Sequence, residues 1–103
     1  MAFDGKEGEV VSLDDAARWT ENYREANQGA IKAHMVGKDK LSSILGQSGC
    51  VGVRIYYGID DDSNACLVLV GVTAEGSDIT SGIIVERLPF CPPVCDASSA
   101  LNG

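Results

Sequence analysis

Four cysteines are the residues of this chain whose type and spacing could support chemistry. Cys50 and Cys66 each open an apolar run typical of a strand, whereas Cys91 and Cys95 enclose a Pro-Pro-Val segment. A pair of thiols can act in redox chemistry, and thiolates can bind zinc. The chain has a single histidine and lacks a nucleophile elbow, a phosphate loop and any standard metal motif. The cysteines are therefore the first candidates for a reactive site.

The segment from Cys91 to Cys95 has two interpretations. In polyproline geometry Pro92-Pro93 would hold the two cysteines roughly 12 Å apart, and redox pairs usually have two intervening residues rather than three. A turn could still bring the thiols together, so Cys91 and Cys95 are kept as candidate redox residues. The favoured interpretation is that both cysteines act as small apolar side chains, which pack a proline-braced segment against the sheet.

A metal site is not expected. Zinc at Cys91 and Cys95 would need two further ligands, and His34 with one strand cysteine are the available donors. The oxygen donors at 60–64 resemble the start of a calcium loop, but the glycine and the glutamate that such a loop requires are Ala65 and Gly71 here. We interpret that run as a solvated turn, and we expect no cofactor.

Two helices are predicted before any clear strand. Ser12 can cap a helix that runs from Leu13 to about Ala26, because apolar residues recur there at helical spacing and acidic residues occupy its first turn. A second helix is predicted for 38–47, ended by glycines. The segment 30–36 is too short for its period to be decided.

The remaining ordered part reads as antiparallel sheet. Residues 50–57 and 65–72 are rich in β-branched and aromatic residues, and a polar turn separates them, which predicts a hairpin. A third strand is expected at 79–88. In the hairpin Cys50 and Cys66 would lie roughly 20 Å apart, which is beyond disulfide reach. The predicted fold class is α+β, in two layers, with the N-terminal helices packed on a small antiparallel sheet.

Arg54 is the polar residue that stands out inside the first strand of the hairpin. It must face solvent or be paired, and Glu86 in the third strand could supply the opposite charge. Together with Tyr56 it could also form a small binding patch. Arg54 and Tyr56 are therefore the candidate binding residues, beside the simpler interpretation of an outward-facing strand surface.

Length and charge limit the class of partner. The 103 residues carry a net charge of −7, and we expect one domain over residues 1–103 with flexible ends at 1–11 and 96–103. The acidic balance argues against nucleic-acid backbones and anionic membranes as partners. The N-terminus lacks the basic start and apolar stretch of a signal peptide, and no apolar run is long enough to span a membrane. We therefore expect a cytoplasmic protein.

Several segments together resemble a family of small, uncharacterised bacterial proteins. The resemblance extends from Leu13 to Cys95 and is carried most clearly by the strand GCVGVRIYYG at 49–58 and the CPPxC motif at 91–95. Matching residues also lie at 13–16, 19–20, 23–24, 31–34, 37–38 and 67–72. The resemblance implies a single complete domain and brings no catalytic residue with it.

The sequence favours a non-enzymatic binding or assembly module. No acid, base, nucleophile and metal ligands assemble into a catalytic constellation. The open edges of a small sheet favour a homodimer or another protein partner. The alternative is a thiol-active redox protein that uses Cys91 and Cys95.

Overall fold

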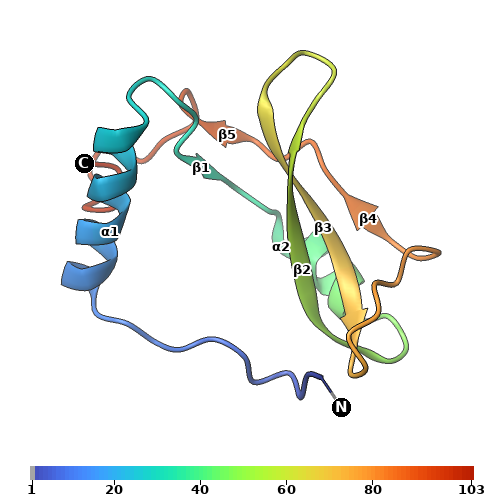
Figure 1. Cartoon of the computed structure of the whole chain (residues 1–103). Coiled ribbons are helices and arrows are strands. Elements are labelled where there is room, and N and C mark those ends of the chain that lie inside the picture. Colours follow the sequence, from blue (N-terminus) through green and yellow to red (C-terminus); the bar gives the residue numbers. More distant parts are fainter. Residues whose placement is uncertain (1) are drawn as a thin grey trace. The chain divides into compact units, whose positions relative to one another are not determined.

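The computed structural model describes residues 2–103. It has two helices and small antiparallel sheets, so the α+β class is confirmed (Figure 1). Close contacts divide the described residues into two compact units, one of residues 2–7 and 35–88 and one of residues 8–34 and 89–103. The expectation of a single domain over 1–103 stays a prediction.

The first unit is built on a long hairpin. Strand β2 (Cys50–Ile59) pairs antiparallel with β3 (Ala65–Thr73), and β4 (Ile84–Val85) pairs with the other side of β3, which gives the order β2-β3-β4. Cys50 lies opposite Thr73, whereas Cys66 lies opposite Gly58 near the turn. Both thiols are free. The predicted hairpin and the predicted separation of Cys50 from Cys66 are therefore confirmed.

The third strand is shorter than predicted. The sequence favoured a strand over 79–88, but only Ile84–Val85 pairs with β3 in regular register. The N–H of Ile79 still donates to the carbonyl of Gly71 at 2.8 Å, and the chain then turns, with the N–H of Gly82 donating to the carbonyl of Ile79 at 3.2 Å. The side chain of Gln47 accepts from the N–H of Ile83 at 2.8 Å. The backbone N–H of Ile83 is thereby bonded to a side chain instead of to a neighbouring strand.

Helix α2 (Lys38–Leu45) covers one face of this sheet. It ends at Leu45, two residues before the predicted boundary, and Gly46, one of the glycines that the sequence indicated, is its C-cap. Its Ile44 is fully buried and forms the core with Leu69 and Val85. The core face of the hairpin is thus the face that carries the odd-numbered residues around Val53 and Leu69.

The second unit contains helix α1 (Leu13–Ala26) and a two-stranded sheet of β1 (Ala33–His34) with β5 (Phe90–Cys91). The bounds of α1 match the prediction, and the hydroxyl of Ser12 accepts from the N–H of Asp15 at 3.1 Å as an N-cap should. The structure groups α1 with the C-terminal segment, so α2 is the helix that packs on the three-stranded sheet.

Hydrogen bonds hold the C-terminal residues in this second unit. The guanidinium of Arg24 donates to the carbonyl of Leu101 at 2.7 Å, and the ammonium of Lys32 donates to the carbonyl of Asn102 at 3.4 Å. The tail at 96–103, expected to be flexible, thus has partners on α1 and beside β1. The flexibility itself stays a prediction.

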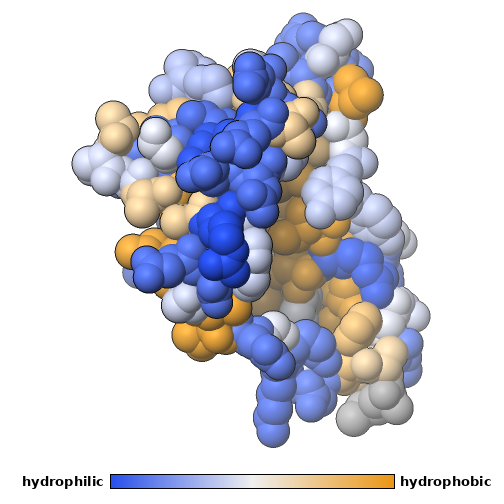
Figure 2. Space-filling model, turned by 60° about the vertical axis from the view of Figure 1, so that its left-hand side comes forward, coloured by the Kyte–Doolittle hydropathy of each residue, from blue (hydrophilic) through white to orange (hydrophobic). Residues whose placement is uncertain are grey.

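Hydrophilic and apolar side chains are interspersed on the face shown in Figure 2. The described residues contain no helix that is long and apolar enough to cross a membrane.

Candidate functional site

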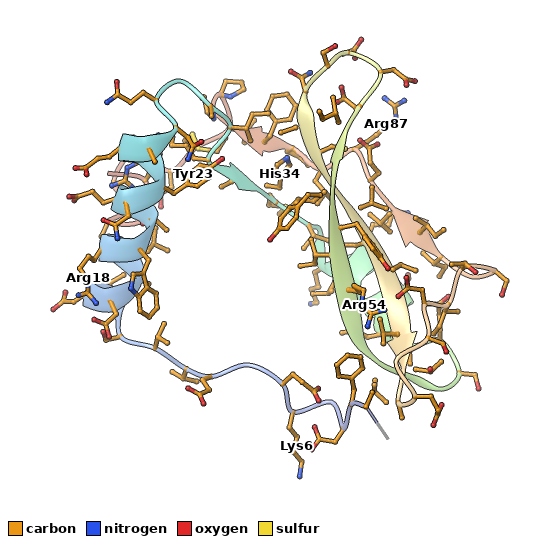
Figure 3. The ribbon with its side chains drawn as sticks, in the orientation of Figure 1. Lys6, Arg18, Tyr23, His34, Arg54 and Arg87 are labelled. Atoms are coloured by element: carbon orange, nitrogen blue, oxygen red, sulfur yellow. A yellow bond between two sulfur atoms is a disulfide. The ribbon has the colours of Figure 1, made fainter. Side chains whose placement is uncertain are left out.

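Arg54 and Tyr56 share one acidic partner. They lie two positions apart on β2 and therefore on the same face, and Arg54 extends from the middle of the strand (Figure 3). The Nη1 atom of Arg54 lies 2.6 Å from Oδ1 of Asp78, and the Tyr56 hydroxyl donates to Oδ2 of the same carboxylate. Asp78 follows β3 and forms an isolated bridge with Val72. The structure thus brings the two predicted binding residues together.

The suggestion that Glu86 could be the partner of Arg54 was wrong. Its Oε2 atom lies 3.8 Å from Nε of the neighbouring Arg87 instead. Nothing in the sequence singles out Asp78, because it stands in a polar turn with a second acidic residue, Glu75. The available signal was that Arg54 and Tyr56 share a strand face and could therefore share a partner.

The three groups shift each other's pKa values in a consistent way. The Tyr56 hydrogen bond and the Arg54 cation hold the pKa of Asp78 below its ordinary value. The hydrogen bond to Asp78 raises the pKa of Tyr56 and also that of Arg54. At neutral pH the cluster is a carboxylate with a guanidinium and a neutral phenol. Its strongest acceptor is already satisfied, so the cluster is suited to fixing β2 in place.

A groove lies beside the first half of β2. It has a volume of about 410 Å³, and one wall is β2 residues 51–55 with Val72, while the other comes from Phe3, Gly5 and Glu7. The N–H of Phe3 donates to the carbonyl of Ala74 at 2.9 Å, and the Arg54 guanidinium lies over the Phe3 ring, 5.6 Å from its centroid. The N-terminal residues that were expected to be flexible therefore form one wall of the groove.

Gly5 allows this wall to approach β2 closely. Its φ is +88°, and a Cβ atom there would lie 3.2 Å from the carbonyl oxygen of Val51. A larger residue would be strained in that conformation and crowded by the strand.

Strand β2 has a free edge, because it is the outer strand of the sheet. The Gly71 carbonyl accepts from Ile79, on the side of β3 away from β2. Since backbone groups alternate in direction along an antiparallel ladder, Val53, which lies opposite Gly71, directs its N–H and C=O to the free edge. The same holds for Ile55 and Tyr57. Among residues 2–103, no other segment donates to these backbone groups or accepts from them.

The side chains along this edge are apolar and open to solvent. Ile55 is 51% exposed, Tyr57 is 91% exposed and Ile59 is 79% exposed. Their alternate spacing places all three on one face of β2. We call Ile55, Tyr57 and Ile59 the β2 stripe.

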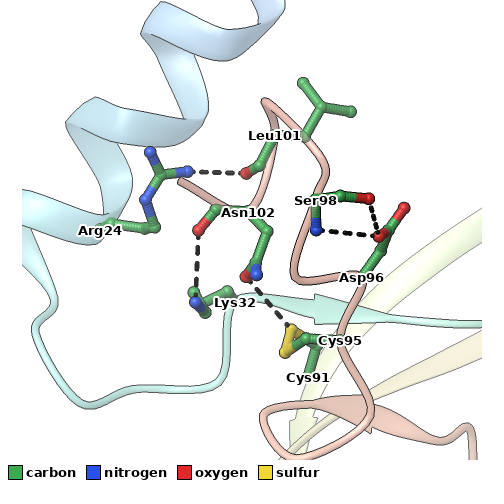
Figure 4. Close-up of a disulfide and its surroundings, with 8 residues drawn as sticks. All are labelled: Arg24, Lys32, Cys91, Cys95, Asp96, Ser98, Leu101 and Asn102. Atoms are coloured by element: carbon green, nitrogen blue, oxygen red, sulfur yellow. Dashed lines mark hydrogen bonds between the residues drawn. A yellow bond between two sulfur atoms is a disulfide. The ribbon is translucent and has the colours of Figure 1, made fainter.

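Cys91 and Cys95 form a disulfide (Figure 4). Their Cα atoms are 4.9 Å apart, since a turn replaces the extended path: the N–H of Val94 donates to the carbonyl of Phe90 at 3.0 Å. The Cys91–Pro92 and Pro92–Pro93 peptide bonds are cis. The disulfide contradicts the favoured interpretation of two separate packed thiols, and it brings the two candidate redox residues together.

The two sulfurs differ in accessibility. Cys91 is 7% exposed and lies in β5, where its carbonyl accepts from the N–H of Lys32 at 2.6 Å. Cys95 is exposed. Oδ1 of Asn102 lies 3.8 Å from Sγ of Cys91. A disulfide sulfur carries no proton, so this contact becomes a hydrogen bond only when Cys91 is a thiol.

Cys66, one of the two free cysteines, is not activated. Burial raises the pKa of the Cys66 thiol, and the nearby carboxylates of Glu86 and Asp60 raise it further. The Cys50 sulfur lies 3.2 Å from the carbonyl oxygen of Gly52. Within the described part of the chain, no group of three or more His, Cys, Asp or Glu side chains is placed to hold a metal ion. The expected absence of a metal site stays a prediction.

Comparisons with protein-family models, with curated proteins and with solved structures found no match to this chain.

Proposed function

We propose that this protein is a non-enzymatic binding or assembly module that accepts an extended protein strand along the free edge of β2. The observation that supports the proposal is the outward direction of the backbone groups of Val53, Ile55 and Tyr57, with exposed apolar side chains beside them. Strand addition uses such an edge, because main-chain hydrogen bonds supply affinity and neighbouring pockets supply specificity.

The surroundings of β2 favour strand addition in two ways. Arg54 and Tyr56 are held by Asp78, so the strand is fixed before a partner arrives and less ordering entropy is lost on binding. The groove beside residues 51–55 leaves room for side chains of an added strand. In this proposal Arg54 and Tyr56 position the edge.

The finer parts of the proposal concern partner class and location. A net charge of −7 favours protein partners over nucleic acids or anionic membranes. We further propose that the protein is bacterial, as the resemblance described above implies, and that it acts in the cytoplasm.

A proline substitution at the β2 edge tests the proposal. Random peptides displayed on phage would be selected against the full chain and then measured against Ile55→Pro and Ile55→Val. The Ile55 N–H points away from β3, so proline removes the outward donor and leaves the hairpin ladder intact. We expect the selected peptides to contain alternating apolar residues. Their dissociation constants should rise at least about tenfold for Ile55→Pro, which corresponds to about 1.4 kcal/mol of binding free energy. The dissociation constants should be unchanged for Ile55→Val.

Two outcomes would count against strand addition. One is that no peptide is enriched, and the other is that enriched peptides bind Ile55→Pro as tightly as the unmodified chain. Far-ultraviolet circular dichroism of Ile55→Pro provides the folding control.

The alternative function is thiol–disulfide exchange, and the exposure of Cys95 in the Cys91–Cys95 disulfide favours it. A thiolate of a protein dithiol would attack Sγ of Cys95, break the disulfide and release Cys91 as a thiolate, which takes a proton from water. The second thiol of the substrate then attacks its own sulfur in the mixed disulfide and releases Cys95. The substrate dithiol is oxidised to a disulfide while this chain is reduced.

A trapping experiment tests the alternative. In a Cys91→Ser variant the remaining Cys95 thiol should form a stable mixed disulfide with oxidised glutathione. In a Cys95→Ser variant the buried Cys91 thiol should form this mixed disulfide at least about tenfold more slowly, because the rate of exchange depends on access to the sulfur. Equal rates for the two variants would remove the assignment of Cys95 as the attacked sulfur.

A further inference from the structure

We propose that the strand accepted by β2 is the β2 strand of a second copy, paired antiparallel about a two-fold axis that passes beside Ile55. The inference rests on the proposed function, because it names the occupant of the same edge. A two-fold pair of edge strands makes one continuous six-stranded sheet from two three-stranded sheets.

The direction of the backbone groups limits the register. Outward-facing residues of one strand must meet outward-facing residues of the other, so the axis must pass through a residue of β2 and not between two. An axis at Arg54 would place Arg54 opposite Arg54 of the second copy, and like charges directly opposite each other are unfavourable. An axis at Ile55 avoids this clash and lies near the middle of Cys50–Ile59.

The axis at Ile55 also gives a matched set of facing residues. Arg54 would face Tyr56 of the second copy, and Val53 would face its Tyr57. Glycines meet at both ends, since Gly52 would face Gly58. A guanidinium beside a phenol ring is a favourable pair, and so is a β-branched residue beside an aromatic one.

The same register explains the groove and the most exposed aromatic residue together. The part of the second strand that carries Ile55 to Tyr57 would run along Val53 to Ile55, which line the groove. Tyr57 of the second copy, 91% exposed in the single chain, would thereby lie against Val53. Burial of the β2 stripe supplies apolar contact area.

Local charge does not oppose this pairing although the whole chain is acidic. Arg54 is the one charged residue within Cys50–Ile59, and in this register it faces the uncharged Tyr56 of the second copy. The remaining repulsion comes from the net charge of −7 on each copy and is screened beyond about 8 Å at physiological ionic strength. Added salt should therefore strengthen the dimer.

Cysteine cross-linking tests the register directly. At the proposed axis the two Ile55 Cα atoms would be about 5.5 Å apart, which is within the range of a disulfide. An Ile55→Cys variant should therefore form an intermolecular disulfide under mild oxidation, as mapped by mass spectrometry of the linked peptides. Ile59→Cys is the matched control, because it lies on the same stripe but about 27 Å from its counterpart.

Charge insertion tests the interface. Sedimentation over a wide concentration range should show a reversible dimer for the unmodified chain, and Ile55→Lys should raise its dissociation constant at least about tenfold, because two lysines would then face each other. Val10→Lys should leave the dissociation constant within about threefold, since it adds the same charge at a residue that is 102% exposed and lies outside β2.

The outcomes separate this inference from the proposed function. A chain that is monomeric at every concentration, or a dimer that Ile55→Lys leaves intact, overturns the inference. Peptide binding that is lost in Ile55→Pro would in that case still support strand addition by a foreign partner. A dimer that links Ile59→Cys instead of Ile55→Cys overturns the register.

Discussion

Opening the Cys91–Cys95 disulfide should destabilise the second unit by about 2 kcal/mol. The bridge joins residues four positions apart, and the chain-entropy relation gives roughly 2 kcal/mol at 25 °C for a loop of that size. With a urea dependence of about 2 kcal/mol per molar, the unfolding midpoint should fall by about 1 M. The effect is modest because the closed loop is short.

Trp19 reports this transition. It is the single tryptophan of the chain, it lies in the second unit, and it is 51% exposed beside Leu101 in a small surface pocket. Its fluorescence should follow urea unfolding with and without a reductant. The matched variant is Cys95→Ser, which should coincide with the reduced unmodified chain and should not respond to reductant.

An unchanged Trp19 midpoint on reduction would refute the reasoning. It would mean that the hydrogen bonds of Arg24 and Lys32 hold the segment without the bridge. Circular dichroism in the strand region adds a second comparison. If it shifts together with Trp19 fluorescence, residues 1–103 unfold as one cooperative domain, as the sequence predicted.

Three further outcomes are expected. Because its pKa in the folded protein is depressed, Asp78 contributes stability at neutral pH that is lost as the pH falls below about 4. Asp78→Asn should therefore flatten the acid dependence of the urea midpoint, and it should lower the raised pKa of Tyr56 in an alkaline absorbance titration. An unchanged Tyr56 titration would contradict the hydrogen bond between Tyr56 and Asp78. Ending the chain after Cys95 should lower the Trp19 midpoint, because the partners of Arg24 and Lys32 are removed. An identical midpoint would support the expectation of a flexible tail at 96–103. Cys66 should react with iodoacetamide at pH 7 more slowly than a free thiol, because its pKa is raised, and a rate equal to that of glutathione would contradict its burial.

Local signals predicted the helices and the hairpin well. The Ser12 cap and the spacing of apolar residues fixed α1, because these interactions are made within a few residues of sequence. The hairpin followed from two β-branched runs and a polar turn, and the separation of Cys50 from Cys66 followed from the hairpin. Arg54 was singled out because a charged residue inside an apolar strand needs a partner, and Asp78 is that partner.

Contacts between distant segments were not predictable in the same way. Asp78 meets Arg54 across 24 positions of sequence, and nothing local distinguishes it from the other turn carboxylates. Gln47 interrupts the third strand across 36 positions. The composition of segment 3–7 is that of a free chain end. Its place beside β2 depends on one hydrogen bond from Phe3 to Ala74 and on the close approach of Gly5 to the strand, and composition does not reveal such contacts.

The pairing of Arg54 with Asp78 has a consequence for the chain before it folds. The segment Val53 to Tyr57 is short, rich in β-formers and free of proline, which is the composition of sequences that stack into amyloid. In the nascent chain Asp78 has not yet met Arg54, so the guanidinium stands as an uncompensated charge in the middle of that segment and keeps identical strands apart, as gatekeeper residues do. Folding pairs that charge with Asp78 at the moment when the edge becomes ordered. Replacing Arg54 by an uncharged β-former would therefore be expected to reduce the soluble yield during synthesis before any loss appears in the stability of the folded protein.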